Sequence, residues 1–152
     1  MRLPARIAVA VVPPALAAVL GSRSARTAPE VYRRLDKPDW APPEQVFGPV
    51  WTVLYALIGT AGWRLTRRPQ PALVGLHLSQ LGLNAAWTPL FFGAGRRRAA
   101  VAVSVALDVA LVAEILALAR RDRAAAALLV PYLAWTGYAT ALATAVTEKN
   151  ES

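Results

Sequence analysis

Five long apolar stretches, separated by short runs rich in arginine and proline, constrain this chain most strongly. About 20 apolar residues cross the roughly 30 Å hydrocarbon core of a bilayer, because a helix rises about 1.5 Å per residue. The stretches are residues 3–21, 46–63, 71–95, 99–119 and 124–147. The sequence therefore predicts an all-α fold, an integral membrane bundle of five transmembrane helices that forms a single domain over residues 1–152.

Composition agrees with a membrane protein and excludes several kinds of site. The 152 residues are 56% hydrophobic, which is too apolar for an ordinary soluble domain. The chain has no cysteine, so disulfides, thiolate metal sites and cysteine nucleophiles are excluded. It has one histidine, His77, so we expect no metal site. No nucleophile triad, phosphate loop or dinucleotide fingerprint is present.

The excess of basic residues is spread along the chain as short caps between apolar stretches. A formal charge of +8 could indicate nucleic acid, but a nucleic-acid binder gathers its charge on one face or tail, so we expect no such partner. With five spans, eight Lys and Arg fall on the amino-terminal side and nine on the other, 17 in all. The positive-inside rule therefore leaves the orientation open.

One connection is long, residues 22–45, and the others have a handful of residues each. Four prolines with Tyr32 and Trp40 predict a stiff, ordered loop. Composition leaves open whether this loop is an interfacial anchor or a lid over a pocket. The basic start and apolar run of residues 3–21 also fit a cleaved signal peptide, with a cleavage site near Ser22.

The third stretch has a stripe of polar and aromatic residues at alternating spacings of three and four. This spacing places them on one face of a helix, which should point into the bundle. There they either form hydrogen bonds between helices or line a cavity. The stripe consists of His77, Gln80, Asn84, Trp87 and Phe91. His77 would need a partner to accept a proton, and the sequence does not show one.

Two further stretches have aromatic faces, and the fourth has two acids. Trp51 and Tyr55 share a face of the second stretch, and Tyr132, Trp135 and Tyr138 share one of the fifth. Such faces either pack together or leave a slot for a planar ligand. Asp108 and Glu114 point about 120° apart on a helix and are not a carboxylate pair. Asp108, in mid-span, must be neutral, paired or hydrated.

Several separated motifs resemble the tryptophan-rich sensory protein family, also called the translocator or TspO/MBR family. The motifs are Lys37–Pro43, Val50–Trp51 with Leu54–Tyr55, Gln80–Asn84 with Trp87 and Phe91–Gly93, and Pro131–Trp135 followed by Ala139–Thr140. They lie in register over roughly Pro29 to Leu142. The resemblance favours a retained first helix over a cleaved signal, and a lined slot over mere packing.

The resemblance implies a five-helix bundle, usually a homodimer, whose aromatic cavity binds protoporphyrin IX or haem beneath the long first loop. It places Trp40 in this lid, and Trp51, Asn84, Trp87, Trp135 and Ala139 around the cavity. The other predicted ligand-binding residues are Tyr55, His77, Gln80, Phe91, Tyr132 and Tyr138. No cofactor is required, because the tetrapyrrole is the ligand.

The leading hypothesis is a membrane sensory or binding protein for tetrapyrroles that affects their trafficking, signalling or breakdown. One alternative is light- and oxygen-dependent porphyrin degradation, with Trp51 and Trp135 as the catalytic residues. Another is transport of a porphyrin or small molecule along His77, Gln80, Asn84 and Asp108, and a fourth is a structural scaffold. The use of alanine and arginine suggests a GC-rich genome and hence a bacterial cell membrane.

Overall fold

The computed structural model describes the backbone of residues 1–152 and every side chain except that of Ser24. All regular secondary structure in the described residues is helical, which confirms the all-α part of the predicted fold class. The helices are α1 (Leu3–Ser24), α2 (Ala28–Arg34), the 3-10 turn η1 (Glu44–Val46), α3 (Phe47–Leu65), α4 (Pro71–Thr88), the π-helical turn η2 (Pro89–Gly93), α5 (Arg97–Ala119) and α6 (Arg123–Glu151).

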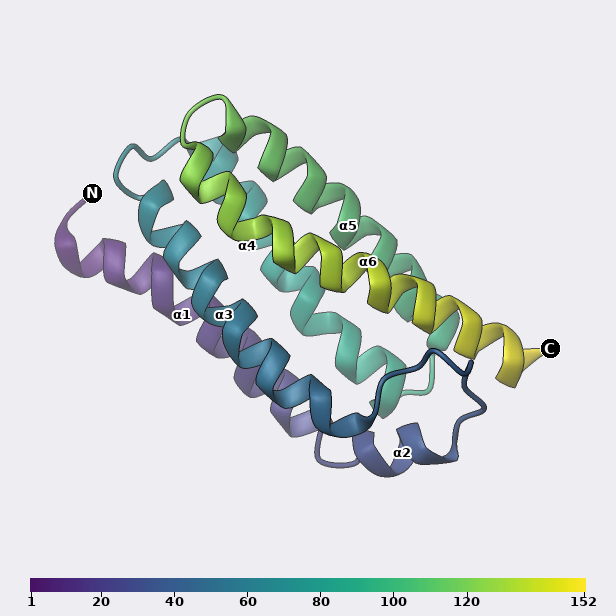
Figure 1. Ribbon diagram of the computed structural model, residues 1–152. Helices are drawn as coiled ribbons and strands as arrows, with labels where there is room; N and C mark the ends of the chain where they lie inside the picture. The colour runs from purple at the N-terminus through teal and green to yellow at the C-terminus, as the bar shows by residue number, and fades with distance from the viewer.

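The five long helices form a closed ring. Following the contacts around the bundle, α1 packs on α3, α3 on α6, α6 on α5, α5 on α4, and α4 on α1. Figure 1 shows these helices running lengthwise together, with the two termini at opposite ends and α2 beside the end where the C-terminus lies. The interior of the ring is bordered by helices that are not consecutive in the sequence, such as α1 with α4 and α3 with α6.

Four of the helices are long and apolar enough to cross a membrane. They cover Leu3–Arg23, Glu44–Leu65, Arg97–Ala119 and Arg123–Glu151. The fifth helix, α4, is not among them, because His77, Gln80 and Asn84 lower its hydropathy. Its 18 residues nevertheless pack between α1 and α5, inside the same ring. The predicted crossing of five helices is thus supported for four of them, and that of α4 stays a prediction.

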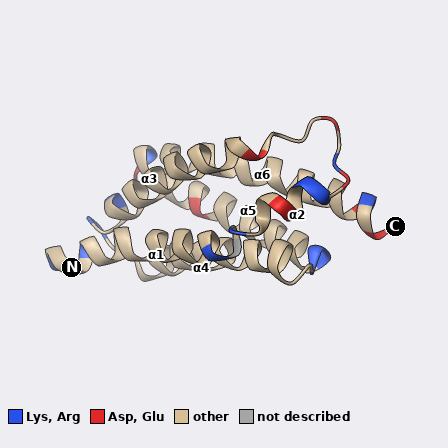
Figure 2. Ribbon diagram, turned by 90° about the horizontal axis from the view of Figure 1, so that it is seen from below, with Lys and Arg blue, Asp and Glu red and all other residues tan. Residues whose placement is uncertain are grey.

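Charged residues lie mainly at the two ends of the bundle. Figure 2 shows most basic segments at the helix ends and connections, and red acidic segments within the long helices are few. Large apolar side chains are exposed on the outside of α1 and α5, among them Val11, Leu16, Val109 and Leu116. In water such faces would be costly, whereas in hydrocarbon they are matched to their surroundings. The outer surface therefore suits lipid.

Two stretches differ from the sequence-based boundaries. Residues 22–45 are not one loop, because α1 continues to Ser24 and a short helix, α2, begins beside Pro29, a residue suited to the first helical turn. The stretch 71–95 is not one α-helix either. Pro89 has no N–H to continue the α-helical pattern, and the Ala94 N–H donates to the Pro89 carbonyl in a π-helical turn.

Buried side chains form two clusters along the bundle. The larger one lies in the middle and includes Leu54, Ile58, Leu111 and Leu129. The smaller one, which includes Phe91 and Val146, lies near α2 and packs against Leu35 and Ala41. The space that all five long helices and α2 border lies between these clusters.

Candidate functional site

A cavity of about 470 Å³ opens inside the ring beneath α2. Ligand pockets in proteins are commonly about 300–1,000 Å³ and mostly apolar, so this cavity has room for a drug-sized ligand. Every long helix contributes to its wall, together with η2 and the segment between α1 and α3. A ligand bound here would touch all parts of the bundle.

Aromatic rings form much of the cavity wall. On α3, the rings of Trp51 and Tyr55 lie 5.4 Å apart between centroids. On the opposite side, Trp87 and Phe91 stack at 5.0 Å with an angle of 14° between their planes. Trp135 of α6 meets the edge of Phe47 at 5.8 Å. Flat rings on several sides favour a planar, aromatic ligand, which can stack or make edge contacts with each of them.

Few polar groups interrupt this apolar wall. The Tyr55 hydroxyl donates to Oδ1 of Asn84 at 2.9 Å, which links α3 to α4 across the cavity. Glu44 lines the rim and pairs with Arg33 of α2 at 3.3 Å. Because Arg33 is largely exposed, it is a cation that a ligand carboxylate at the rim could approach.

The segment 25–46, here called the lid, is fastened over the cavity by hydrogen bonds and ring contacts. The Tyr32 hydroxyl donates to the Pro42 carbonyl at 2.7 Å, and its ring meets the edge of Phe47 at 5.4 Å. Burial, and secondarily the nearby Tyr138, raises the pKa of Tyr32. The hydroxyl therefore stays a neutral donor at physiological pH.

Two further contacts fix the lid to α6. The Tyr138 hydroxyl donates to the Trp40 carbonyl at 2.9 Å, and the two rings meet at 5.7 Å. Near the C-terminus, Asn150 accepts from the Asp36 N–H and donates to the Asp36 carbonyl. These contacts hold the segment against α6. The prolines predicted a stiff segment but left open whether it is a lid or an interfacial anchor, and its lining residues place it over the cavity.

The structure brings seven of the twelve predicted ligand-binding residues to the cavity. They are Trp51, Tyr55, Asn84, Trp87, Phe91, Trp135 and Ala139. The other five lie elsewhere: Trp40, His77, Gln80, Tyr132 and Tyr138 are not among its lining residues. Trp40 and Tyr138 hold the lid from outside the cavity, and Tyr132 is fully buried behind Trp51, with 6.1 Å between their rings.

The polar stripe of α4 divides because the helix runs from the cavity into the packed core. His77 is 1% exposed, and its Nδ1 lies 2.6 Å from Oε1 of Glu114 on α5. Glu114 is the partner that sequence alone did not reveal. Asp108 is also partnered, since it accepts from the Thr140 hydroxyl at 2.7 Å. His77, Gln80, Asn84 and Asp108 therefore do not line one common path.

Sequence reasoning missed the contribution of the lid and of the start of α3. Pro29, Tyr32, Glu44 and Phe47 all line the cavity, although none was predicted to do so. The signal was present in the proline-rich, aromatic character of this segment. It gave no register, however, because lid side chains lack the helical period that identifies an inward face.

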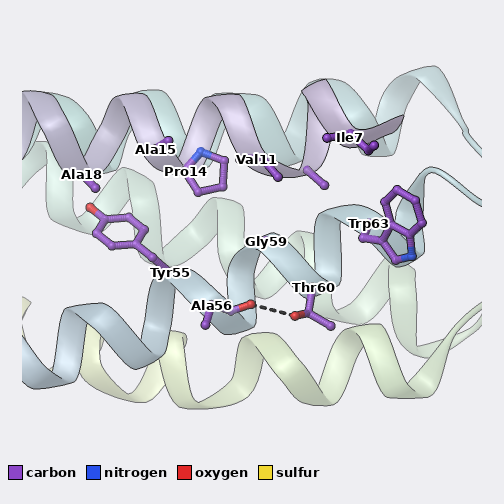
Figure 3. Close-up of a pocket in the computed structure, with 11 residues that line it drawn as sticks. Ile7, Val11, Pro14, Ala15, Ala18, Tyr55, Ala56, Gly59, Thr60 and Trp63 are labelled. Carbon is purple, nitrogen blue, oxygen red and sulfur yellow. Dashed lines mark hydrogen bonds between the residues drawn. The ribbon is translucent and has the colours of Figure 1, made fainter. Parts of the chain in front are cut away.

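A second hollow, of about 500 Å³, is a shallow apolar groove between α1 and α3. Figure 3 shows Ile7, Val11 and Pro14 of α1 facing Gly59 and Trp63 of α3. At its far end the Arg6 guanidinium lies 4.3 Å from the centre of the Trp63 ring. Its exposed aliphatic lining belongs to the outer surface, so this groove is a different kind of feature from the lidded cavity.

Comparison with known proteins identifies relatives of the chain. The family model described as TspO/MBR matches residues 9–148. The chain is 39% identical over 118 residues to the tryptophan-rich protein TspO of Chlorobaculum tepidum, covering 73% of each chain. It is 38% identical to the human translocator protein, covering 73% of this chain and 69% of that one. It is also 38% identical to the tryptophan-rich sensory protein of Cereibacter sphaeroides, covering 74% and 72%.

Proposed function

The chain belongs to the TspO/MBR family, and we propose that it binds a tetrapyrrole in the cavity beneath the lid. Membership and the four membrane-competent helices make it an integral membrane protein of the sensory or binding type. The observation that supports the ligand class most directly is the wall of Trp51, Trp87 and Trp135, which faces one cavity from three helices. A flat macrocycle offers aromatic surface to each.

The cavity fits a metal-free porphyrin better than one that needs an axial ligand from the protein. Histidine, cysteine and methionine are absent from the described lining residues. The single histidine, His77, is bonded to Glu114 outside the cavity. We therefore expect protoporphyrin IX to bind at least as tightly as haem. Haem would bind through its ring and carboxylates without coordination by imidazole.

The remaining parts of the proposal concern the membrane and assembly. We propose that α4 crosses the bilayer with the other four long helices, its polar stripe facing inward, in a bacterial cell membrane. We also propose a homodimer, because the family that the chain resembles is usually dimeric. Native mass spectrometry of the protein released from membranes would detect the dimer, and a monomer at every concentration would contradict it.

The direct test is a dark titration of the detergent-purified protein with protoporphyrin IX, following the porphyrin absorption band. We expect saturation near one porphyrin per protomer. Trp51→Phe and Trp135→Phe should each weaken binding by up to about tenfold, because the smaller ring keeps only part of an aromatic contact that contributes about 0.5–1.5 kcal/mol. Trp63→Phe is the matched control, since Trp63 lies in the outer groove and not in the cavity. Linear uptake, equal in all four proteins, would contradict the proposal.

Light-dependent degradation of the bound porphyrin is a second candidate, because Trp51 and Trp135 both line the cavity. There is no metal-binding cluster among the described residues, so light absorbed by the ligand and dissolved oxygen would drive the reaction. Under illumination in air we expect Trp135→Phe to slow loss of the porphyrin when compared at equal occupancy. Equal rates in the wild type and this variant would exclude a role for Trp135.

A further inference from the structure

Outside the cavity, a buried pair of titratable side chains, His77 and Glu114, lies where α1, α3, α4 and α5 meet. Nδ1 of the His77 ring faces Oε1 of Glu114 on α5 at 2.6 Å. Nε2 faces α3, since a Cβ added to Gly62 would lie 2.9 Å from it. Ala10 of α1 borders the same point. His77 and Glu114 are 1% and 0% exposed, so neither group reaches solvent.

The surroundings of this pair supply no compensating charge. The helices packed against it present the Gly62 backbone from α3 and Ala10 from α1. On α6, the titratable group near Glu114 is Tyr132. Tyr132 is also near Asp108 of α5. Within the described part of the chain, neither lysine nor arginine forms a salt bridge with Glu114. The net charge of the pair therefore depends on whether Glu114 and His77 are each protonated.

Hydrogen bonding distinguishes the possible charge states of the pair. Nε2 of His77 and Oε2 of Glu114 are buried without a partner among the described residues. An ion pair would leave a cationic N–H without an acceptor and a carboxylate with a single hydrogen bond, which is costly in an apolar interior. An ionised Glu114 beside a neutral imidazole would leave a whole uncompensated charge. A neutral acid beside a neutral imidazole avoids both costs.

The contact itself is compatible with this assignment. The 2.6 Å between Oε1 of Glu114 and Nδ1 of His77 is a hydrogen-bond distance, so one proton is shared between these two atoms. We propose that Glu114 is a neutral carboxylic acid donating to Nδ1 of a neutral His77. The pair then forms a proton-binding site in the bundle, separate from the cavity.

The packing of α1, α3, α4 and α5 around His77 depends on the proton in the hydrogen bond between His77 and Glu114. Removal of the proton would leave a carboxylate at the point where α4 and α5 join and where α3 and α1 approach the imidazole. Ionisable groups within membrane bundles commonly mark proton sites for this reason. The site does not depend on the tetrapyrrole, because Asn84, Trp87 and Phe91 of the stripe line the cavity, whereas His77 and Gln80 do not.

The single histidine makes the site directly observable. The protein is labelled with ¹⁵N-histidine, freed of any histidine tag, and studied by NMR in lipid bilayers. At neutral pH we expect one imidazole with Nε2 protonated and Nδ1 unprotonated. An imidazolium with both nitrogens protonated, or the opposite neutral tautomer, would overturn the proposal.

Variants of Glu114 separate a neutral donor from an ion pair. Glu114→Gln keeps a donor for Nδ1 at nearly the same volume, so we expect the wild-type tautomer and unfolding temperature. Glu114→Ala removes the donor and should lower the unfolding temperature by several degrees. Asp108→Asn is the matched control on α5 and should leave the His77 spectrum unchanged.

An equal loss of stability in Glu114→Gln and Glu114→Ala would mean that the charge of Glu114 is needed, and the proposal would fail. Should Glu114→Ala not fold, the tautomer of the wild type and of Glu114→Gln still decides. Binding of protoporphyrin IX by folded Glu114→Gln should match the wild type. The proton site and the cavity can therefore fail separately.

Discussion

Gly62 provides a sharp test of the packing around His77. A Cβ at this position would lie 2.9 Å from Nε2 of His77, closer than carbon and nitrogen pack without a shift. The imidazole cannot turn aside cheaply, because it is 1% exposed and its other nitrogen is bonded to Glu114. Gly62→Ala must therefore strain the α3–α4 contact or weaken that hydrogen bond.

The magnitude follows from two opposed effects. Overpacking a well-filled core costs about 1–3 kcal/mol, whereas replacing a helical glycine by alanine contributes about 0.5–1 kcal/mol of stability. The two ranges leave a net loss for Gly62→Ala of about 0–2.5 kcal/mol, centred near 1 kcal/mol. For a chain of this size the central value corresponds to an unfolding temperature lower by about 2–4 °C. Gly82→Ala is the control, because a Cβ there meets nothing within 4 Å.

Thermal unfolding in one detergent, at equal protein concentration, measures both variants. We expect Gly62→Ala below the wild type and Gly82→Ala at or above it. In a His77→Ala background the effect of Gly62→Ala should disappear, since the opposing ring is gone. If Gly62→Ala is as stable as Gly82→Ala, or if its effect persists without His77, the proposed contact is wrong.

Three further predictions concern polar contacts. Hydrogen bonds from Arg64 and from the first turn of α6 lower the pKa of Asp122. A folded-state pKa that is depressed gives stability that is lost as the pH falls through that pKa. Below about pH 4, acid should therefore destabilise the wild type more than Asp122→Asn, which thermal unfolding across a range of pH would measure. Thr140→Val removes the hydroxyl that donates to Asp108 and should cost about 1–3 kcal/mol, measured by unfolding; an unchanged unfolding temperature would contradict it. Tyr138→Phe removes a hydrogen bond to the lid backbone and should increase the rate of porphyrin dissociation in stopped-flow measurements, whereas an unchanged rate would mean that this bond does not restrain the lid.

The fold was largely predictable because apolar length and polar punctuation specify membrane helices locally. Arg67 and Arg68, or Arg120 and Arg121, end apolar stretches near where helices end. The helical period also predicted that Asn84, Trp87 and Phe91 would share an inward face, and the cavity wall confirms it. The helical period could not show which residues of that face reach the cavity and which lie in the packed core. His77 has the same orientation as Asn84, yet it lies in the packed core.

Contacts between distant residues were the main part that sequence could not supply. His77 and Glu114 are 37 positions apart, and Tyr138 and Trp40 are 98 apart. Neither pair has a spacing that marks it, because the packing of the ring sets both. Pro89 illustrates a further limit. Its missing N–H ends the α-helical hydrogen-bond pattern, but the choice of a π-helical turn depends on the local hydrogen-bond acceptors.

The division of the α4 stripe has a consequence for ligand choice. One face of one helix contributes Asn84 and Trp87 to the cavity and His77 to a closed polar pair. His77 lies in the packed core and not in the cavity wall, so the only imidazole of the chain does not reach a metal bound in the cavity. Selectivity among tetrapyrroles would then have to come from ring stacking and from groups at the rim, such as Arg33 and Glu44. Protoporphyrin IX should accordingly bind more tightly than its dimethyl ester, whose carboxylates are masked. Equal affinities in the same dark titration would place recognition in the aromatic wall alone.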